Sequence, residues 1–213
     1  IFKFSDDATV KVLYGEAFQE PAPLQLFGGW NGRAANPDLK PEEASNLEFI
    51  FMYQGAYILH DISVFRAKYK NVIKEEAENA GSRNITGLEY RARFNIKNVF
   101  LGLPDIDGYF YYTYTDSESS ITYNHVEQEW NEKKSSLGDI AQHKVNVGLN
   151  WPLRDNFELN LRLNYVGQRD FYSRNPLRAQ GDVLDSYYTL DLNANYRWES
   201  VSLSLKVKNL TGE

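Results

Sequence analysis

The sequence predicts an all-β fold, an antiparallel transmembrane β-barrel wall, on the strength of three observations. Apolar and polar residues alternate along nine segments, several of these reach ten residues or more, and short and long connections follow one another in turn. A side-chain period of two puts one set of residues on each face of a strand. Strands of soluble proteins have about five or six residues, whereas about ten tilted residues cross a bilayer.

The alternation is clearest between Phe157 and Tyr165, where every odd-numbered residue is apolar and every even-numbered residue is polar. The same template predicts strands near 8–18, 45–54, 57–73, 84–96, 108–116, 142–152, 156–167, 186–198 and 200–209. We expect the face that meets lipid to carry Leu159, Leu161, Leu163, Leu190, Leu192, Leu203 and Leu205. We expect the face that lines the lumen to carry Glu158, Arg162, Asp191, Arg197 and Lys206.

The connections support the same interpretation. Tight turns are expected at 54–55, 153–155 and 199–200, and long polar segments at 19–44, 74–83, 117–141 and 168–185; the connection 97–107 is of intermediate length. Outer-membrane barrels have short turns on one rim and long loops on the other. The four long segments should therefore share one rim, opposite Gly55, Asp155 and Ser200. Rings near predicted strand ends suit an interfacial girdle: Tyr14, Trp151, Tyr165, Tyr187, Tyr188, Tyr196 and Trp198.

The composition excludes several classes of protein. There is no cysteine among the 213 residues, so disulfide and cysteine–metal sites are excluded, and the net charge of −6 without a basic cluster argues against nucleic acid. No apolar run approaches the roughly 20 residues of a membrane helix. A mean hydropathy of −0.54 fits a soluble protein, but a barrel with a polar lumen and wet loops scores the same way. A soluble β-sandwich or lipocalin-like barrel therefore remains an alternative.

Ordered motifs then indicate a family. Tyr14–Pro21 reads YGEAFQEP, 36–42 reads NPDLKPE, 84–90 reads NITGLEY, 112–116 reads YTYTD and 207–211 reads VKNLT. Their order and spacing resemble TonB-dependent receptors, over nearly the whole chain. The motif residues expected to be structural are Phe18, Pro21, Asn36, Pro37, Leu39, Pro41 and Glu42. The prolines fix φ and favour extended conformations before them, and Asp38 is expected to bond nearby backbone in an Asx turn.

The resemblance implies an incomplete 22-stranded barrel. Residues 1–213 would form its C-terminal portion, about strands 13 to 21, with the plug domain, the N-terminal barrel strands and the final strand outside this chain. Two departures from the family pattern are Gln19-Glu20, where Arg-Ala is common, and the end at Glu213 without a terminal aromatic residue.

The resemblance also implies a function and partners. The protein would be an outer-membrane active-transport receptor that imports a scarce nutrient, most simply a ferric siderophore, with energy supplied through TonB. Its partners would be the plug domain, TonB, the lipid and lipopolysaccharide of the bacterial outer membrane, and the small ligand. A passive porin or small independent barrel, and a soluble carbohydrate-binding β-domain, are the alternatives.

Candidate ligand contacts lie in two of the long segments. Aromatic and arginine side chains suit an anionic, ring-bearing ligand such as a catecholate siderophore, through cation–π contacts and charge-assisted hydrogen bonds. These candidates are Trp30, Arg33, Arg169, Phe171, Tyr172 and Arg174. The alternative is that these rings pack the loops against each other.

No enzyme, cofactor or metal site is expected. The sequence has no GxSxG, HExxH or glycine-rich phosphate motif. Its acidic groups, Glu75, Glu76 and Glu78, and Glu127, Glu129 and Glu132, are interpreted as solvated loops rather than a Ca²⁺ site. His143 is expected to be an ordinary wall residue. Haem receptors of the resembled family usually carry a ligand histidine between the two motifs; no histidine occurs between Phe18 and Asn36 here, which counts against haem.

Overall fold

Nine long strands dominate the computed structural model, which describes residues 1–28, 35–74, 77–97 and 105–212. They are β2 (Ala8–Gln19), β3 (Glu42–Gln54), β4 (Ile58–Lys70), β5 (Arg83–Ile96), β6 (Ile106–Ser119), β10 (His143–Arg154), β11 (Phe157–Val166), β14 (Tyr187–Trp198) and β15 (Val201–Val207). All nine predicted strands are confirmed. β3 begins three residues before the predicted start, and β6 extends two and three residues beyond its predicted limits.

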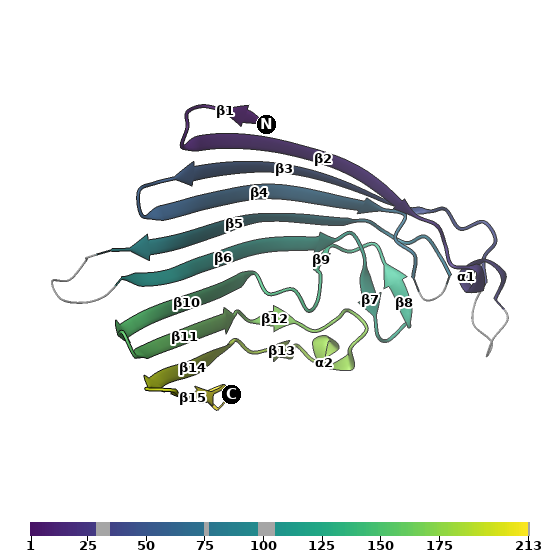
Figure 1. The fold of residues 1–213 in the computed structure, drawn as a ribbon. Helices are drawn as coiled ribbons and strands as arrows, with labels where there is room; N and C mark the ends of the chain where they lie inside the picture. Colours follow the sequence, from purple (N-terminus) through teal and green to yellow (C-terminus); the bar gives the residue numbers. More distant parts are fainter. Residues whose placement is uncertain (29–34, 75–76, 98–104, 213) are drawn as a thin grey trace.

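The long strands form one antiparallel sheet in the order of the sequence (Figure 1). The short strand β1 (Phe2–Lys3) pairs with β2 at one end of this order, and β15 pairs with β14 at the other. Within the described residues β2 and β15 do not pair, so the sheet does not close into a small barrel. This agrees with the expectation of an incomplete barrel.

Register divides the side chains between two faces, because directly opposed residues of neighbouring strands share a face. Leu161 lies opposite Leu149 and Leu192, while Arg162 lies opposite Gly148 and Asp191. We call the first the apolar face and the second the polar face. All seven leucines predicted to face lipid lie on the apolar face, and the five charged residues predicted to face the lumen lie on the polar face.

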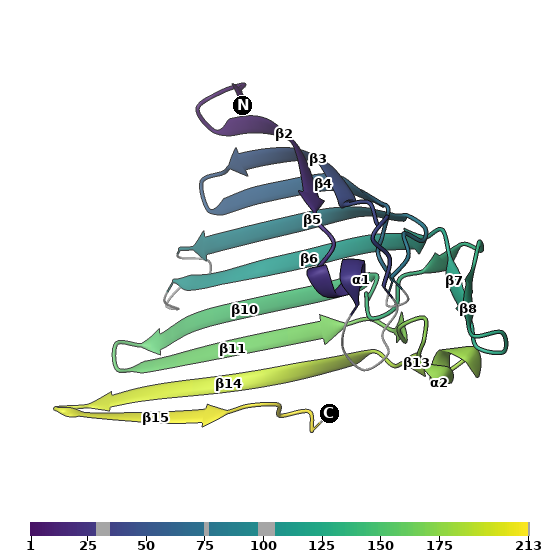
Figure 2. The ribbon, with the colours of Figure 1, turned by 90° about the vertical axis from the view of Figure 1, so that its right-hand side faces the viewer.

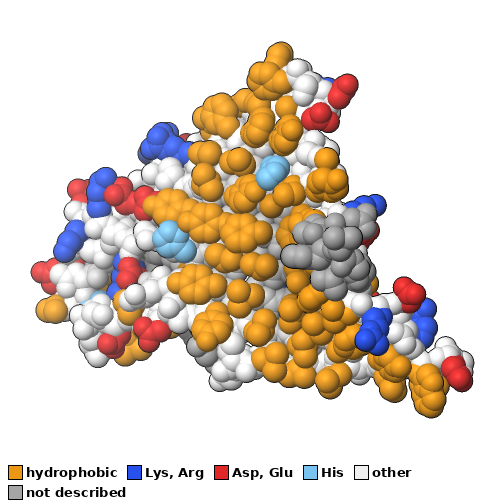
Figure 3. Space-filling model, turned by 90° about the vertical axis from the view of Figure 1, so that its left-hand side faces the viewer, with side chains coloured by type: hydrophobic (Ala, Val, Ile, Leu, Met, Phe, Trp, Pro, Cys, Tyr) orange, Lys and Arg blue, Asp and Glu red, His pale blue; other side chains and the backbone are white. Residues whose placement is uncertain are grey.

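Among the described residues, no second layer covers the apolar face. Hydrophobic side chains gather in a band across it, with charged groups toward its margin (Figure 3). The buried hydrophobic residues among those described are Leu39, Val72, Ala77, Ala92, Ile121 and Ala141, and all but Ala92 lie in connections between the long strands. A soluble sandwich would bury its apolar face against another layer. The leucines are not in a closed protein core, which overturns the soluble alternative.

The two rims of the sheet differ as predicted. Long connections join β2 to β3, β4 to β5, β6 to β10 and β11 to β14 on one rim, which we call the loop rim (Figure 2). Short turns at 55–57, 155–156 and 199–200 lie on the opposite, turn rim. The loop rim also carries α1 (Pro23–Phe27), β7 (Thr122–Asn124), β8 (Glu129–Asn131), β9 (Ser135–Ser136), β12 (Arg169–Asp170), α2 (Pro176–Ala179) and β13 (Val183–Leu184).

The aromatic girdle needs two corrections. Tyr14 lies in the middle of β2 rather than near its end. Tyr187 lies on the polar face, because it opposes Val166 and precedes Tyr188, which opposes Tyr165 on the apolar face. The girdle prediction missed this because it used nearness to the strand end, although the period of two puts Tyr187 on the same face as Asp191. No helix among the described residues is long and apolar enough to cross a membrane.

Candidate ligand-binding rim and lumen face

The NPDLKPE segment folds the long connection after α1 back into β3. Asn36 accepts a hydrogen bond from the Asp38 backbone N–H at 3.0 Å. The Asx turn is therefore made by Asn36, and its assignment to Asp38 was wrong. Pro37, which fixes φ between them, and the buried Leu39 complete the bend.

The neighbouring loop 71–82 clamps this segment. The side chain of Asn79 accepts from the Lys40 N–H at 2.7 Å and donates to the Lys40 carbonyl at 2.9 Å and the Asn71 carbonyl at 2.8 Å. Glu42 accepts from the Ile73 N–H at 2.6 Å, and Asn71 donates to the Pro41 carbonyl at 3.3 Å. These hydrogen bonds hold the NPDLKPE segment against loop 71–82 on the loop rim.

The other motif residues lie at the end of β2. Phe18 is 71% exposed on the apolar face, opposite Glu43, and Pro21 is buried just before α1. Gln25 of α1 accepts a hydrogen bond from the Ala22 N–H at 2.9 Å. Trp30 and Arg33, the ligand candidates of this connection, lie outside the described residues.

A cluster of rings and cations joins three of the long connections. Arg174 Cζ lies 4.7 Å from the centre of the Tyr123 ring, which is 5.3 Å from the Trp130 ring. Lys74, only 6% exposed, places Nζ 3.9 Å from the centre of Trp130. The β7–β8 hairpin thus stands between loop 71–82 and loop 167–186. Arg174 was predicted; Tyr123, Trp130 and Lys74 were missed, although a tryptophan in a polar loop is a detectable signal.

The remaining candidates line loop 167–186 near β10. Arg169 Cζ lies 5.9 Å from the Tyr187 ring, and its buried Nη1 has no hydrogen-bond partner among the described residues. Tyr172 is 40% exposed. Phe171 contributes its carbonyl group to Arg178, at 2.8 Å. The structure therefore brings Arg169, Phe171, Tyr172 and Arg174 onto one rim.

Arg178 fastens this loop to the connection after β6. Its guanidinium donates to the Phe171 carbonyl, to the Ser136 carbonyl at 2.9 Å and to Ser136 Oγ at 3.0 Å, and it lies 3.6 Å from Asp170. Gly138 packs so closely on the backbone of Phe171 that a Cβ would overlap it. Nothing in the local sequence distinguishes this clamping arginine from the candidate ligand residues.

The histidines take part in local contacts. His143 begins β10 and lies 2.9 Å from the Tyr112 hydroxyl, which confirms it as a wall residue. His60 of β4 lies 2.8 Å from the Tyr90 hydroxyl. His125 binds the Ser173 carbonyl at 2.9 Å and so ties the β7–β8 hairpin to loop 167–186.

The structure describes only some of the acidic residues singled out in the sequence. Glu127 accepts hydrogen bonds from Asn124 and Asn131. Over the described part of the chain, no three His, Asp or Glu side chains come together to hold a metal ion. Glu75 and Glu76 lie outside the described residues.

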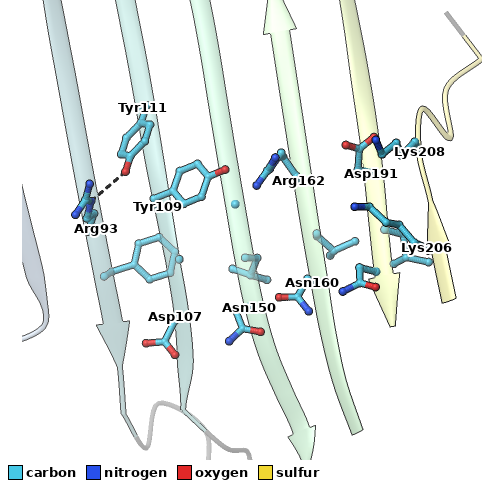
Figure 4. Close-up of a pocket in the computed structure, with 17 residues that line it drawn as sticks. Arg93, Asp107, Tyr109, Tyr111, Asn150, Asn160, Arg162, Asp191, Lys206 and Lys208 are labelled. Atoms are coloured by element: carbon cyan, nitrogen blue, oxygen red, sulfur yellow. Dashed lines mark hydrogen bonds between the residues drawn. The ribbon is translucent and has the colours of Figure 1, made fainter. Parts of the chain in front are cut away.

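On the polar face, a groove of about 730 Å³ crosses β5, β6, β10, β11 and β14 on the turn-rim side (Figure 4). Polar and charged side chains from all five strands point into it, together with Lys206 and Lys208 from β15 and the residues after it. In its lining, Gly148 allows the Tyr109 ring to lie across β10, since a Cβ there would overlap the ring. No sequence pattern predicted this groove, because it combines side chains from strands far apart in the chain.

These features define a class of protein: a single antiparallel sheet of long strands, with an uncovered apolar face, a polar face and rims of unequal loops, is the wall of an outer-membrane β-barrel. Residues 1–210 match the model of the family described as "TonB dependent receptor-like, beta-barrel". The chain therefore belongs to the TonB-dependent receptor β-barrel family, and it is a bacterial outer-membrane protein.

Individual relatives agree with this assignment. The chain is 24% identical over 201 residues to the vitamin B12 transporter BtuB of Vibrio vulnificus, covering 92% of this chain and 29% of that protein. It is 26% identical to the heme/hemopexin utilization protein C of Haemophilus influenzae, covering 96% of this chain and 32% of that protein. The chain thus spans about a third of the length of these relatives.

A solved structure shows the same fold. The ferric-catecholate import receptor Fiu from E. coli K12, in its closed form, superposes with a TM-score of 0.75 at 19% identity. The match covers all of this chain and 30% of the receptor.

Proposed function

We propose that this chain is part of the barrel of a receptor that binds a ferric siderophore at its loop rim and imports it with energy delivered through TonB. In this proposal the remaining strands and a plug domain belong to the same polypeptide, and the chain has no catalytic role. The apolar face meets lipid, the polar face lines the lumen, and the loop rim faces the cell exterior.

The arrangement of arginine and aromatic side chains on the loop rim carries the siderophore proposal. Arg174 stacks on Tyr123, and Arg169 lies beside Tyr187 with a buried guanidinium nitrogen unpaired among the described residues. A buried donor without a partner calls for an acceptor, and a catecholate oxygen is an anionic acceptor carried on an aromatic ring. Guanidinium groups recognise such anions through charge-assisted hydrogen bonds and ring faces through cation–π contacts.

The same stacking ties the loops together. Arg174 and Tyr123 come from different connections. A ligand bound to Arg174 would therefore lie next to the cation–π contact that joins the two loops. Ligand binding and loop order are therefore coupled in this proposal. Trp30 and Arg33 remain proposed contacts from the connection between β2 and β3.

Uptake by intact cells tests the proposal. The cells carry the full-length receptor and no other uptake system for the compound tested. They are given one of three compounds: a tricatecholate siderophore loaded with radioactive iron, cyanocobalamin, or haemin. Each uptake is measured with and without TonB. We expect TonB-dependent uptake of iron from the siderophore alone. Uptake of cyanocobalamin or haemin in its place would refute the siderophore assignment, and uptake without TonB would refute energised import.

Variants then locate the binding site. Arg169→Ala and Arg174→Ala should each weaken siderophore binding by about tenfold, the usual loss for one charge-assisted hydrogen bond. Lys133→Ala removes an exposed cation from the same rim and should leave binding unchanged. Equal effects of all three substitutions would show that only the general charge of the rim matters.

A further inference from the structure

The groove on the polar face has a surplus of positive charge. Arg93, Arg162, Lys206 and Lys208 line it, against two carboxylates, Asp107 and Asp191. Both carboxylates are already engaged: Asp107 accepts from the Asn95 side chain, and Asp191 accepts from the Asn209 N–H at 2.9 Å. The groove therefore has two more cations than anions, and its anions have partners.

Within the described part of the chain, these four cations have no carboxylate partner. Arg93 Nε donates to the Tyr111 hydroxyl at 3.0 Å, which holds its guanidinium at the groove (Figure 4). Arg162 lies directly opposite Asp191 in the register. Even so, neither Arg162 nor Lys206 forms a hydrogen bond or an ion pair through its side chain with any described residue. Both groups are exposed on the open face, so water solvates them until another body covers the groove.

The neutral residues of the groove favour a polypeptide as the partner that covers it. Asn150, Asn160 and Asn193 offer both donors and acceptors, which suits the N–H and carbonyl groups of a peptide chain. Tyr109 and Tyr111 stack at 4.6 Å and form a flat apolar edge. A free, multiply charged anion would gain nothing from acceptor groups and would be repelled by Asp107 and Asp191.

We propose that this groove is the docking site of an acidic polypeptide segment inside the lumen, with its carboxylates on Arg162 and Lys206. The proposal rests on the proposed function, because it requires a plug domain in the lumen. A plug that covers the groove removes water from the cations, and an unpaired buried charge is strongly unfavourable. The covering surface must therefore bring carboxylates of its own.

Photo-crosslinking in the full-length receptor tests this docking site. Tyr109 is replaced by the photoreactive residue p-benzoylphenylalanine, and the same replacement at Phe110 is the control. These two residues are consecutive on β6, but Tyr109 faces the groove and Phe110 lies on the apolar face. We expect the probe at 109 to capture a peptide of the same receptor from outside residues 1–213, with two or more Asp or Glu residues. The probe at 110 should not capture it.

Charge reversal at the two cations is a second test of the docking site. Arg162→Glu combined with Lys206→Glu should lower the crosslink yield at 109 by about tenfold or more, as for close charge pairs at interfaces. Lys11→Glu, on the same face of the distant strand β2, should leave the yield unchanged. Capture of a peptide without carboxylates, capture of no peptide, or a yield unaffected by the reversal would each overturn the proposal.

Uptake measured on the same receptors separates this proposal from the proposed function. If the receptor imports the siderophore but fails the crosslinking test, only the proposal of an acidic docking segment is refuted. A receptor that crosslinks as expected but imports no siderophore refutes the siderophore assignment and leaves the docking site standing.

Discussion

At the scale of single residues, hydrogen bonds to a neighbouring loop hold the NPDLKPE segment in its bent conformation. The sequence could predict the turn there, because prolines fix φ and Asx side chains bond nearby backbone. It could not predict that Asn36 rather than Asp38 makes the Asx turn, since both types form it. Nor could it predict Asn79 as the clamp, because that asparagine is 39 residues from Lys40 and reaches it only in the fold.

Replacing Asn79 should loosen this clamp. Asn79→Ala removes two hydrogen bonds to Lys40 in the other loop and one to Asn71 within its own loop, each worth about 1 kcal/mol net. We expect faster hydrogen exchange in peptides covering 36–42 and 71–82, with the strands unaffected. Asp38→Ala, a change in an exposed side chain of the same turn, is the control. Equal exchange rates in the two variants would show that Asn79 does not hold the segment.

A second prediction at this scale concerns the space around two glycines in the strands. A Cβ at Gly87 would lie 2.5 Å from Phe65 Cζ and 2.6 Å from the Tyr114 carbonyl oxygen, whereas a Cβ at Gly15 would meet no heavy atom within 4 Å. Gly87→Ala should therefore lower the free energy of unfolding by about 1–3 kcal/mol, the usual cost of overpacking. Gly15→Ala, on the same face of β2, should not lower it. Urea titration of the folded receptor in bilayers measures both, and equal losses would contradict the close approach.

At the scale of the strand, alternation decides which side chains meet lipid. Leu192 lies in a row with Leu161 and Val207 across the apolar face, and Asn195, three residues along the same strand, lies on the polar face. Alternation alone predicted this division, since a period of two holds along each strand. The same period places Tyr187 with Asp191 on the polar face. The girdle assignment of Tyr187 failed because it rested only on nearness to the strand end.

An arginine placed at these two positions should have very different effects. Leu192→Arg puts a charge in the apolar band and should lower the unfolding free energy by about 2–4 kcal/mol, the loss known near the middle of a bilayer. Asn195→Arg should cost far less, because its side chain stays in the aqueous lumen. Urea unfolding in phospholipid vesicles measures the difference. Equal losses would mean that the apolar face does not meet lipid.

At the scale of the whole molecule, strand order fixes the rims. When consecutive strands are antiparallel neighbours in a sheet, the connections between them lie on the two rims in turn. Counting strands was therefore enough to place the four long connections on one rim. The polar-face groove and the cluster of Arg174, Tyr123, Trp130 and Lys74 could not be predicted in this way. Both depend on side chains brought together from strands and loops distant in sequence.

Labelling from outside the cell tests which rim is external. The chain has no native cysteine, so single cysteines can be introduced without background. Val126→Cys lies in a long connection at a residue 92% exposed and should react with a membrane-impermeant maleimide on intact cells. Asp155→Cys, in the opposite turn, should react only after the outer membrane is permeabilised. The reverse pattern would invert the orientation of the sheet.

The central claim is that one face of this sheet meets lipid and the other meets an aqueous lumen. A nitroxide scan of β11, from Phe157 to Val166 in the full-length receptor in bilayers, measures this most directly. We expect collisions with oxygen to peak at 157, 159, 161, 163 and 165. Collisions with a water-soluble nickel complex should not peak at these positions. Odd-numbered positions shielded from both reagents, as in a closed protein core, or a scan without a period of two, would contradict the account.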